Sequence, residues 1–400
     1  MKKSFAVLWA PYRAFLRLPD IPAMIATAWL ARMPIGMNAL AILLFEHEAM
    51  GNFKVAGSIV GIFFVAMAIA APILGRLVDR IGPRLPLIVT GILHPLLLIA
   101  LYIATTQGAH VTALLVIAAA CGFLAPPVTI LTRTTWRHRF SDDHNRKMAY
   151  SIDSIMIELN FTVGPLLVAA LIAASDARIA LAVVIAFSAV AVLIFFASPY
   201  LKYWTREAPV KRHLMGPLTD WRLVALFSLT FGLTFCFGLM EVGYPAYATA
   251  IGWVAFGGIL LALYAVGSAV GGFFYGALHL TSSLERQFTV SLALMAIPPF
   301  MHVAIDQNAL FAVIAFMAGI FIAPALTAQT LLVTKIAPAK YATEAFTWSS
   351  TFIVTGLGVG MAIGGAIAES YHVKAPFLLA GGVIALMAGL SLMLKPRKAQ

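Results

Sequence analysis

Charged residues are scarce in this sequence of 400 residues: Asp, Glu, Lys and Arg together make up 11%. A soluble chain carries about 25%. The composition, which is 62% hydrophobic, therefore excludes a soluble globular protein and predicts an integral membrane protein. Cysteine is also rare, since only Cys121 and Cys236 occur and both lie in long apolar runs. Two such cysteines do not indicate a disulfide framework or a metal cluster.

Motifs of the common catalytic chemistries are missing as well. The sequence contains no nucleophile elbow, no paired metal ligands and no glycine-rich loop that could cradle a phosphate. His47-Glu48 begins like a zinc-protease motif, but Gly51 stands where the second histidine is needed. We therefore expect no enzyme activity, no catalytic residue, no metal and no cofactor.

Long apolar runs are what the sequence has in abundance. A membrane-spanning helix needs about 18 to 20 apolar residues, and twelve runs are long enough, so the sequence predicts an all-α protein with twelve spans. In the first half these runs lie near 21–46, 55–74, 85–105, 111–132, 148–173 and 179–199. In the second half they lie near 223–248, 253–278, 288–305, 309–334, 345–368 and 375–394.

The net charge of +11 is distributed as a topology signal. Lys and Arg gather in the two tails and in every second connection, and only Lys54, Arg178 and Lys374 lie on the other side of the membrane. Cytoplasmic connections carry the excess of basic residues, so we expect both termini in the cytoplasm. The basic residues are expected to contact anionic lipid rather than nucleic acid.

A polar stretch over 200–222 divides the chain into two sets of six spans. We expect an amphipathic cytoplasmic segment at 1–20, helical bundles at 21–199 and 223–394, a cytoplasmic linker between them and a short tail at 395–400. The segment Ala-Pro-Pro-Val-Thr at 125–129 is similar to Ala-Pro-Ala-Leu-Thr at 323–327, which indicates a weak internal repeat. Gly356, Gly360 and Gly364 have the four-residue spacing that lets helices approach closely.

The most specific motif is a basic stretch over 75–84, which we expect to form a tight loop at the membrane surface. It reads Gly75-Arg76-Leu77-Val78-Asp79-Arg80-Ile81-Gly82-Pro83-Arg84. It resembles the loop between the second and third helices of the major facilitator superfamily, with the pattern Gly-x-Leu-x-Asp-Arg-x-Gly-x-Arg/Lys. The resemblance implies two pseudo-symmetric six-helix bundles, a multi-pass place in a bacterial inner membrane and a drug-exporter-like transporter. It also implies a conformational latch formed by Gly75, Arg76, Asp79, Arg80, Gly82 and Arg84.

Four charged residues inside the spans are candidates for function. Arg32 is expected near the midplane, where it either binds an anionic substrate or pairs with an acidic residue of a neighbouring helix. Glu158 is the leading proton-coupling candidate, because loss of hydration favours its neutral form unless a cation such as Arg32 is close. Asp153 and Glu241 are further candidates, although Asp153 is nearer the cytoplasm and favours pairing with loop arginines.

Uncharged polar residues in the spans predict a substrate cavity. Together with Arg32, the candidates are Asn38, His94, Asn160 and Gln329. For His94, a packed and hydrogen-bonded role is the alternative. Substrate sites in such repeat folds lie between the halves near the midplane.

The first functional hypothesis is a secondary transporter that works by alternating access and exports a small organic molecule against proton entry, as a monomer. The second keeps the fold but reverses the direction, so that Arg32 grips an organic anion for proton-coupled uptake. The third, from another class, is a membrane enzyme or a non-transporting sensor.

Overall fold

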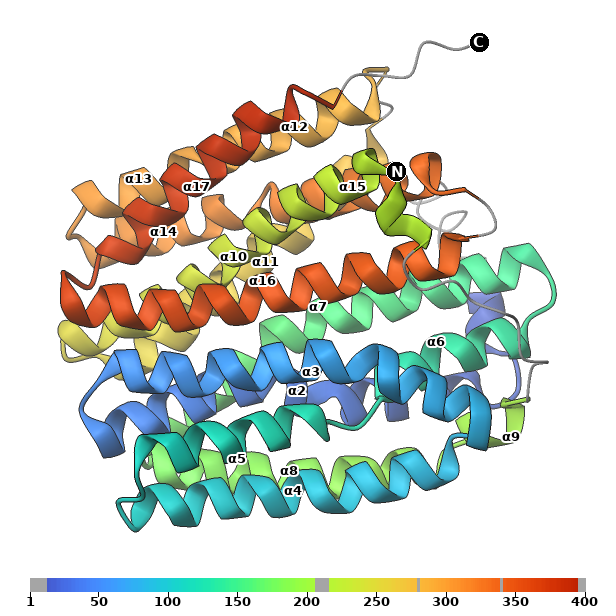
Figure 1. The fold of residues 1–400 in the computed structure, drawn as a ribbon, viewed down its shortest axis with the longest axis horizontal. Coiled ribbons are helices and arrows are strands. Elements are labelled where there is room, and N and C mark those ends of the chain that lie inside the picture. Colours follow the sequence, from blue (N-terminus) through green and yellow to red (C-terminus); the bar gives the residue numbers. More distant parts are fainter. Residues whose placement is uncertain (1–12, 206–215, 279–280, 339–340, 395–400) are drawn as a thin grey trace.

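The computed structural model describes residues 13–205, 216–278, 281–338 and 341–394, and almost all of these are helical. The long helices run along one common direction and connect at the two ends of the molecule (Figure 1). Most of the amphipathic segment predicted at 1–20 and the whole tail at 395–400 lie outside the described residues. Of the former, residues 13–16 are helical.

The first half of the chain forms helices α2 to α9. Their bounds are α2 Ile21–Met50, α3 Phe53–Ile81, α4 Arg84–Thr106, α5 Val111–Phe123, α6 Val128–Arg139, α7 Asp143–Ala174, α8 Ala177–Phe196 and α9 Tyr200–Tyr203. The second half has a short η1 at Gly216–Thr219 and helices α10 to α17. These are α10 Trp221–Ala250, α11 Val254–Ala277, α12 Leu284–Met295, α13 Ile297–Ala304, α14 Asn308–Gly319, α15 Ile322–Ile336, α16 Ala342–Ser370 and α17 Ala375–Ser391.

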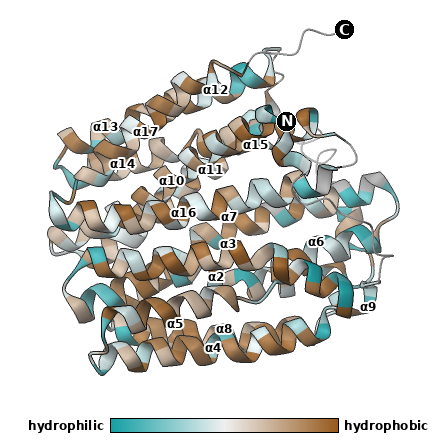
Figure 2. Cartoon of the chain, viewed as in Figure 1, coloured by the Kyte–Doolittle hydropathy of each residue, from teal (hydrophilic) through white to brown (hydrophobic). Residues whose placement is uncertain are grey.

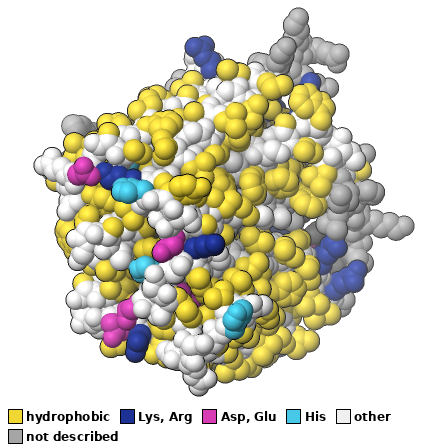
Figure 3. Space-filling model, turned by 60° about the vertical axis from the view of Figure 1, so that its left-hand side comes forward, with side chains coloured by type: hydrophobic (Ala, Val, Ile, Leu, Met, Phe, Trp, Pro, Cys, Tyr) yellow, Lys and Arg dark blue, Asp and Glu magenta, His cyan; other side chains and the backbone are white. Residues whose placement is uncertain are grey.

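Twelve spans are confirmed in the described part of the chain. Eleven helical segments are long and apolar enough to cross a membrane, three of them made of two consecutive helices, and the shorter apolar helix α17 completes the set. Hydrophobic residues colour most of each helix, and the hydrophilic ones gather toward the ends of the molecule (Figure 2). Large apolar side chains such as Phe273 and Leu193, 73% and 69% exposed, cover the outside, as the space-filling view also shows (Figure 3).

Two predicted connections turn out to be helical. The stretch at 75–81 was expected to be a loop, but α3 continues to Ile81 and the chain turns only at Gly82, whose φ is 89°. Likewise, the basic residues at 137–139, in the connection expected between the spans near 111–132 and 148–173, belong to α6. At 1.5 Å per residue, the 29 residues of α3 extend about 43 Å, well beyond a hydrocarbon core of about 30 Å. The last turns of α3 can therefore carry arginines without burying their charge in lipid.

The internal repeat is visible as two matching helix breaks. The fourth span is interrupted between α5 and α6 at 124–127, and the tenth between α14 and α15 at 320–321. Pro126 and Pro127 lie in the first break and Pro324 follows the second. Proline lacks the amide hydrogen that a helix interior needs, so the related motifs account for related interruptions.

The two halves meet mainly through α3 with α16 and through α7 with α11. We call the end of the molecule that carries α9 the linker end, and the opposite one the far end. Glycines bring the backbones together near the far end: a Cβ on Gly61 would lie 2.6 Å from the carbonyl oxygen of Gly358, and one on Gly365 2.2 Å from that of Phe53. On the other side of the interface, Gly258 approaches Ala169 and Pro165. The halves are thus closed against each other at the far end.

One charged contact joins the halves at this closed end. The backbone N–H of Phe53, the first residue of α3, donates to a carboxylate oxygen of Glu369 at 2.8 Å. The first amides of a helix have no partner within the helix and attract negative charge. His47 stacks on Phe53 with 3.7 Å between ring centroids. Glu369 therefore ties the last turn of α16 to the start of α3.

We expect Glu369→Ala to loosen the far end. A hydrogen bond to a charged group contributes about 1.5–3 kcal/mol, so the population open at the far end should rise about 10- to 100-fold. Distances between spin labels at Lys54 and Tyr371, measured in a variant with Cys121 and Cys236 replaced, would lengthen. Glu48→Ala is the matched control, because Glu48 and Arg178 are exposed and 3.8 Å apart. Unchanged distances in Glu369→Ala would contradict the role of this contact.

Candidate functional site

A buried ion pair joins the first and fifth spans. A guanidinium nitrogen of Arg32 lies 2.7 Å from one carboxylate oxygen of Asp153, and both side chains are almost fully buried, with exposed fractions of 2% and 1%. Arg133 contacts the other carboxylate oxygen at 3.3 Å from a side chain that is 52% exposed. Asp153 thus serves two arginines, of which only Arg32 is withdrawn from solvent.

This arrangement gives Arg32 an acidic partner on a neighbouring helix, which was one of the two alternatives for it. The partner in the structure is Asp153, and the side chain of Glu158 lies outside the described residues. Arg32 stands about 16 Å from the start of the 30-residue α2, a little before the middle of the helix. Asp153 was also expected to pair with loop arginines, and the arginine that contacts it from outside the ion pair, Arg133, belongs to the helix α6.

Aromatic rings close off the ion pair from the linker end. Tyr200 of α9 lies within electrostatic range of both Arg32 and Asp153. It packs edge-on against Trp136, with 5.4 Å between centroids, and stacks on Phe195. A charge enclosed in this way is stabilised by its partner rather than by water. In this conformation the guanidinium of Arg32 is thus both paired and enclosed.

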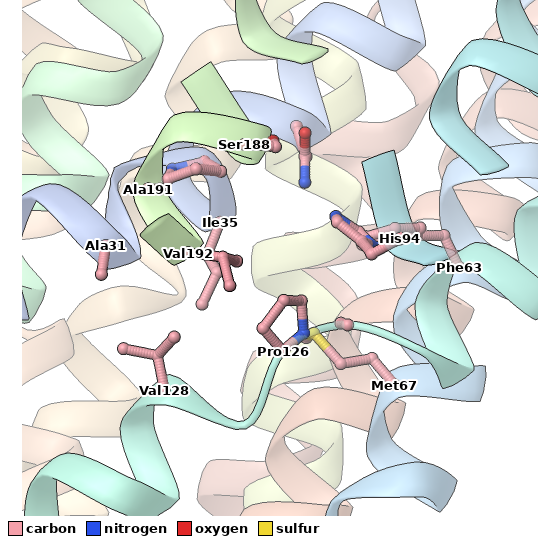
Figure 4. Close-up of a pocket in the computed structure, with 13 residues that line it drawn as sticks. Ala31, Ile35, Phe63, Met67, His94, Pro126, Val128, Ser188, Ala191 and Val192 are labelled. Carbon is pink, nitrogen blue, oxygen red and sulfur yellow. The ribbon is translucent and has the colours of Figure 1, made fainter. Parts of the chain in front are cut away.

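Asn38 and His94, two of the predicted cavity residues, line one pocket inside the first half (Figure 4). The pocket lies between α2, α3, α4, α8 and the break that separates α5 from α6. His94 and Asn38 are 3% and 2% exposed. Nδ1 of His94 lies 3.0 Å from the carbonyl oxygen of Cys121. The side-chain amide of Asn38 has no hydrogen-bond partner among the described residues.

The other two predicted cavity residues lie elsewhere. Asn160 is buried where α7 crosses α2, and a Cβ on Gly36 would lie 2.3 Å from its backbone oxygen. Gln329 is in the second half, where its amide nitrogen donates to the hydroxyl of Ser349 at 2.9 Å. The structure thus joins Asn38 with His94 but does not bring Asn160 or Gln329 to the same pocket.

Glu241 is a half-buried carboxyl group of the second half. It lies on α10 one turn from Phe237 and one turn from Tyr244, both of which contact Tyr264 of α11 with centroid distances of 6.2 and 5.8 Å. No other described residue forms a hydrogen bond or an ion pair with it. A carboxyl group in an aromatic, membrane-buried setting without a cation can take up and release a proton.

The predicted latch residues lie together at the end of α3 and the start of α4. A Cβ on Gly82 would lie 3.8 Å from the ring of Trp204, which follows α9. Next to Trp204, the hydroxyl of Tyr203 donates to Asp20 at 2.7 Å, which raises the pKa of Tyr203 and ties α9 to the start of α2. The motif is therefore in contact with the segment that leads toward the second half. Its action as a latch stays a prediction.

Two carboxyl groups with buried or bridging contacts were not among the site residues predicted from the sequence. Glu369 bridges the halves, and Glu46 is fully buried, where it accepts a hydrogen bond from Thr105 at 2.8 Å. Both lie within a turn of a helix end, a place where glutamates are usually solvated. The sequence offers little indication of these contacts, because the pattern of apolar and polar residues does not show that the turns at the far end pack against each other.

Comparisons with known proteins agree with this architecture. A family model described as Major Facilitator Superfamily matches residues 24–282 and 226–400. The chain is 29% identical over 160 residues to "Multidrug resistance protein MdtG" of Salmonella heidelberg (strain SL476), a match that covers 39% of this chain and 38% of that protein.

Solved structures with a similar fold include two transporters. The nucleoside transporter NupG has a TM-score of 0.73 at 14% identity, over 95% of this chain and all of that one. The human organic anion transporter MFSD10 (TETRAN) has a TM-score of 0.64 at 13% identity, over 94% of this chain and all of that one. At such identities the similarity shows the fold alone.

Proposed function

The chain belongs to the major facilitator superfamily and is a membrane transporter rather than an enzyme, and we propose that it exports a small organic solute against proton entry by alternating access. The observation that supports alternating access is the closure of the halves at the far end. Tight glycine contacts and Glu369 hold that end. At the linker end, the described residues of α3 and α16 form no comparable contact between glycines.

The orientation is part of the proposal. With the basic connections in the cytoplasm, the linker end faces inward, so the closed far end is the outer one and the conformation is inward-facing. We place the protein in a bacterial inner membrane as a monomer, with 21–199 and 223–394 as the two moving bodies and 200–222 as their linker. The resemblance of part of the chain to a multidrug resistance protein supports export.

The alternative hypothesis of anion uptake requires that the guanidinium of Arg32 is free to bind the anion. Since the buried guanidinium is already paired with Asp153 at 2.7 Å, an anion would have to displace a buried carboxylate. Removing one partner of a buried pair costs about 3–5 kcal/mol. This cost favours export over uptake through Arg32.

The side chain of Glu158, the leading candidate from the sequence, lies outside the described residues. Of the two candidates whose side chains are described, we propose Glu241 for proton coupling ahead of Asp153, which is held by two arginines. We expect Glu241→Gln to lower proton-driven transport at least tenfold, because the amide cannot exchange a proton, while solute exchange without a gradient persists. The assay is uptake of ethidium into proteoliposomes with an imposed pH gradient, and an internal pH dye follows the protons. Glu48→Gln, which changes an exposed carboxylate, is the control. Full gradient-driven accumulation in Glu241→Gln would remove Glu241 from the mechanism.

A further inference from the structure

Histidine, acidic and basic side chains lie on the far end of the molecule, which is turned forward in Figure 3. His47, in the last turn of α2, lies beside the charged contact between the halves. Its ring stacks on the ring of Phe53, with 3.7 Å between the centroids and 15° between the planes. The backbone N–H of Phe53 donates to Glu369 of the second half. Opening of the far end therefore moves the carboxylate of Glu369 away from the surroundings of His47.

The surroundings of His47 suit its neutral form. Its Nδ1 is buried and has no hydrogen-bond partner among the described residues. In a neutral imidazole one ring nitrogen carries no hydrogen, so a bare Nδ1 needs no acceptor. Protonation would place a positively charged N–H there with nothing to accept it, and burying an unpartnered charge is costly. The closed far end therefore disfavours a proton on Nδ1 of His47.

The carboxylate of Glu369 offsets only part of this cost. It lies within electrostatic range of His47, but burial of the imidazole has the larger effect. No hydrogen bond or ion pair joins the two side chains in the part of the chain that the structure describes. When the far end opens, the imidazole loses this neighbour but gains water, which can hydrate both of its N–H groups. The open arrangement is thus the one that binds the proton more tightly.

The other charged and titratable groups of the far end have partners or positions of their own. Glu46 accepts a hydrogen bond from Thr105, and Glu48 faces Arg178 at 3.8 Å. The remaining groups are the exposed Lys54, the ion pair of Lys374 with Asp306, the capping residue Asp176, and the exposed His110 and His372, which both accept a backbone N–H. Glu369 is the charged group that acts on His47 across the contact between the halves.

We propose that His47 is a proton-sensitive switch of the far end: when its imidazole binds a proton, the halves separate there. The inference rests on the proposed function, because it requires that the far end opens during transport and faces outward. In that orientation, protons outside favour the opening of the side from which a proton-driven exporter takes them up. The switch is distinct from Glu241, which lies in α10 of the second half.

The size of the effect follows from the linkage between proton binding and opening. A state that binds more protons gains population as the pH falls, and a hydrated histidine titrates near pH 6.5. A tenfold difference in proton affinity between the open and closed arrangements then raises the ratio of open to closed protein about sevenfold between pH 7.5 and pH 5.

The test measures the opening of the far end in the full chain as the pH is changed. Spin labels are placed at Lys54 and Tyr371 in a variant with Cys121 and Cys236 replaced, and the protein is held in nanodiscs, so that both of its ends meet the same pH. Glu241→Gln is added to remove the proposed coupling carboxyl group from the response. We expect the ratio of long to short distances to rise about five- to tenfold from pH 7.5 to pH 5.

Two variants assign the response to His47. His47→Phe keeps an aromatic ring against Phe53 but cannot bind a proton. His47→Gln keeps a polar side chain, so that a folding defect of one variant leaves the other informative. In both variants the distances should stay short throughout this pH range.

Three control variants should keep the response. His110→Gln is the matched one, because His110 is an exposed histidine of the same end. Glu46→Gln and Glu369→Gln test the two nearby carboxyl groups as other sources of a pH response. Glu369→Gln should also raise the open fraction at every pH, since it removes the charge that the amide of Phe53 contacts.

Three outcomes would overturn the proposal. The first is a response that survives both His47 variants, and the second is a distance that does not change with pH. The third is a distance that shortens as the pH falls, which would show that the charged imidazole binds Glu369 and closes the far end. The ethidium assay is independent of these results. If the distances respond through His47 and that assay fails, the switch stands while proton-coupled export falls.

Discussion

Gly365→Leu is expected to lower transport at least 100-fold while both halves stay folded. A Cβ at this position would lie 2.2 Å from the carbonyl oxygen of Phe53 and 3.1 Å from the Cα of Gly57. Neither backbone atom can move aside unless α16 separates from α3. The substitution therefore blocks closure of the far end but leaves the packing inside each half unchanged. The protein should be held open at the far end, and its solute exchange across the membrane should stop.

The matched control is Gly382→Leu, because Gly382 is an exposed helical glycine with open space around its Cβ position. Spin labels at Lys54 and Tyr371 report the far end, and a second pair at Ser141 and Thr281 reports the linker end. In Gly365→Leu the first distance should lengthen and the second shorten, with no change in the control. Exchange at the wild-type rate would show that the glycine junction is not part of the cycle.

The glycine spacing in α16 shows which part of the helix packing can be predicted from the sequence. The series Gly356, Gly360 and Gly364 correctly predicted close packing, and it faces α10 within the same half. Gly358 and Gly365 lie on another face and form the junction with α3. Periodicity shows which residues share a face, but it does not show which helix that face meets. The inter-half contact therefore appeared only in the structure.

The predictions of the spans, of the end of α3 and of the partner of Arg32 differ in outcome for physical reasons. Hydropathy located the twelve spans, because a bilayer imposes a minimum apolar length. It could not show that α3 continues to Ile81, since arginines can extend from a helix that projects beyond the hydrocarbon. The partner of Arg32 could not be chosen either. Asp153 and Glu158 are both on the fifth span, and only the crossing of α2 and α7 at Gly36 sets which carboxylate is near.

The ion pair of Arg32 and Asp153 leads to the largest expected effect on stability. Asp153→Leu leaves the guanidinium of Arg32 buried without the carboxylate that pairs with it among the described residues, because both side chains are almost fully enclosed. Losing one partner of a buried pair costs about 3–5 kcal/mol. The contact with Arg133 adds little, since that side chain is 52% exposed. We expect a large loss of folded protein, measured as the fraction that stays monodisperse in detergent after heating.

A double variant separates the burial of charge from the loss of packing. In Arg32→Met with Asp153→Leu, both charges are gone and the apolar side chains fill a similar volume, so stability should return to within about 1 kcal/mol of the wild type or exceed it. Arg133→Met, which removes only the exposed cation, should change stability by less than about 1 kcal/mol. Transport by the stable double variant would confirm that Arg32 is structural. A folded double variant that binds ethidium but no longer exchanges it would instead assign the pair a role in the conformational cycle.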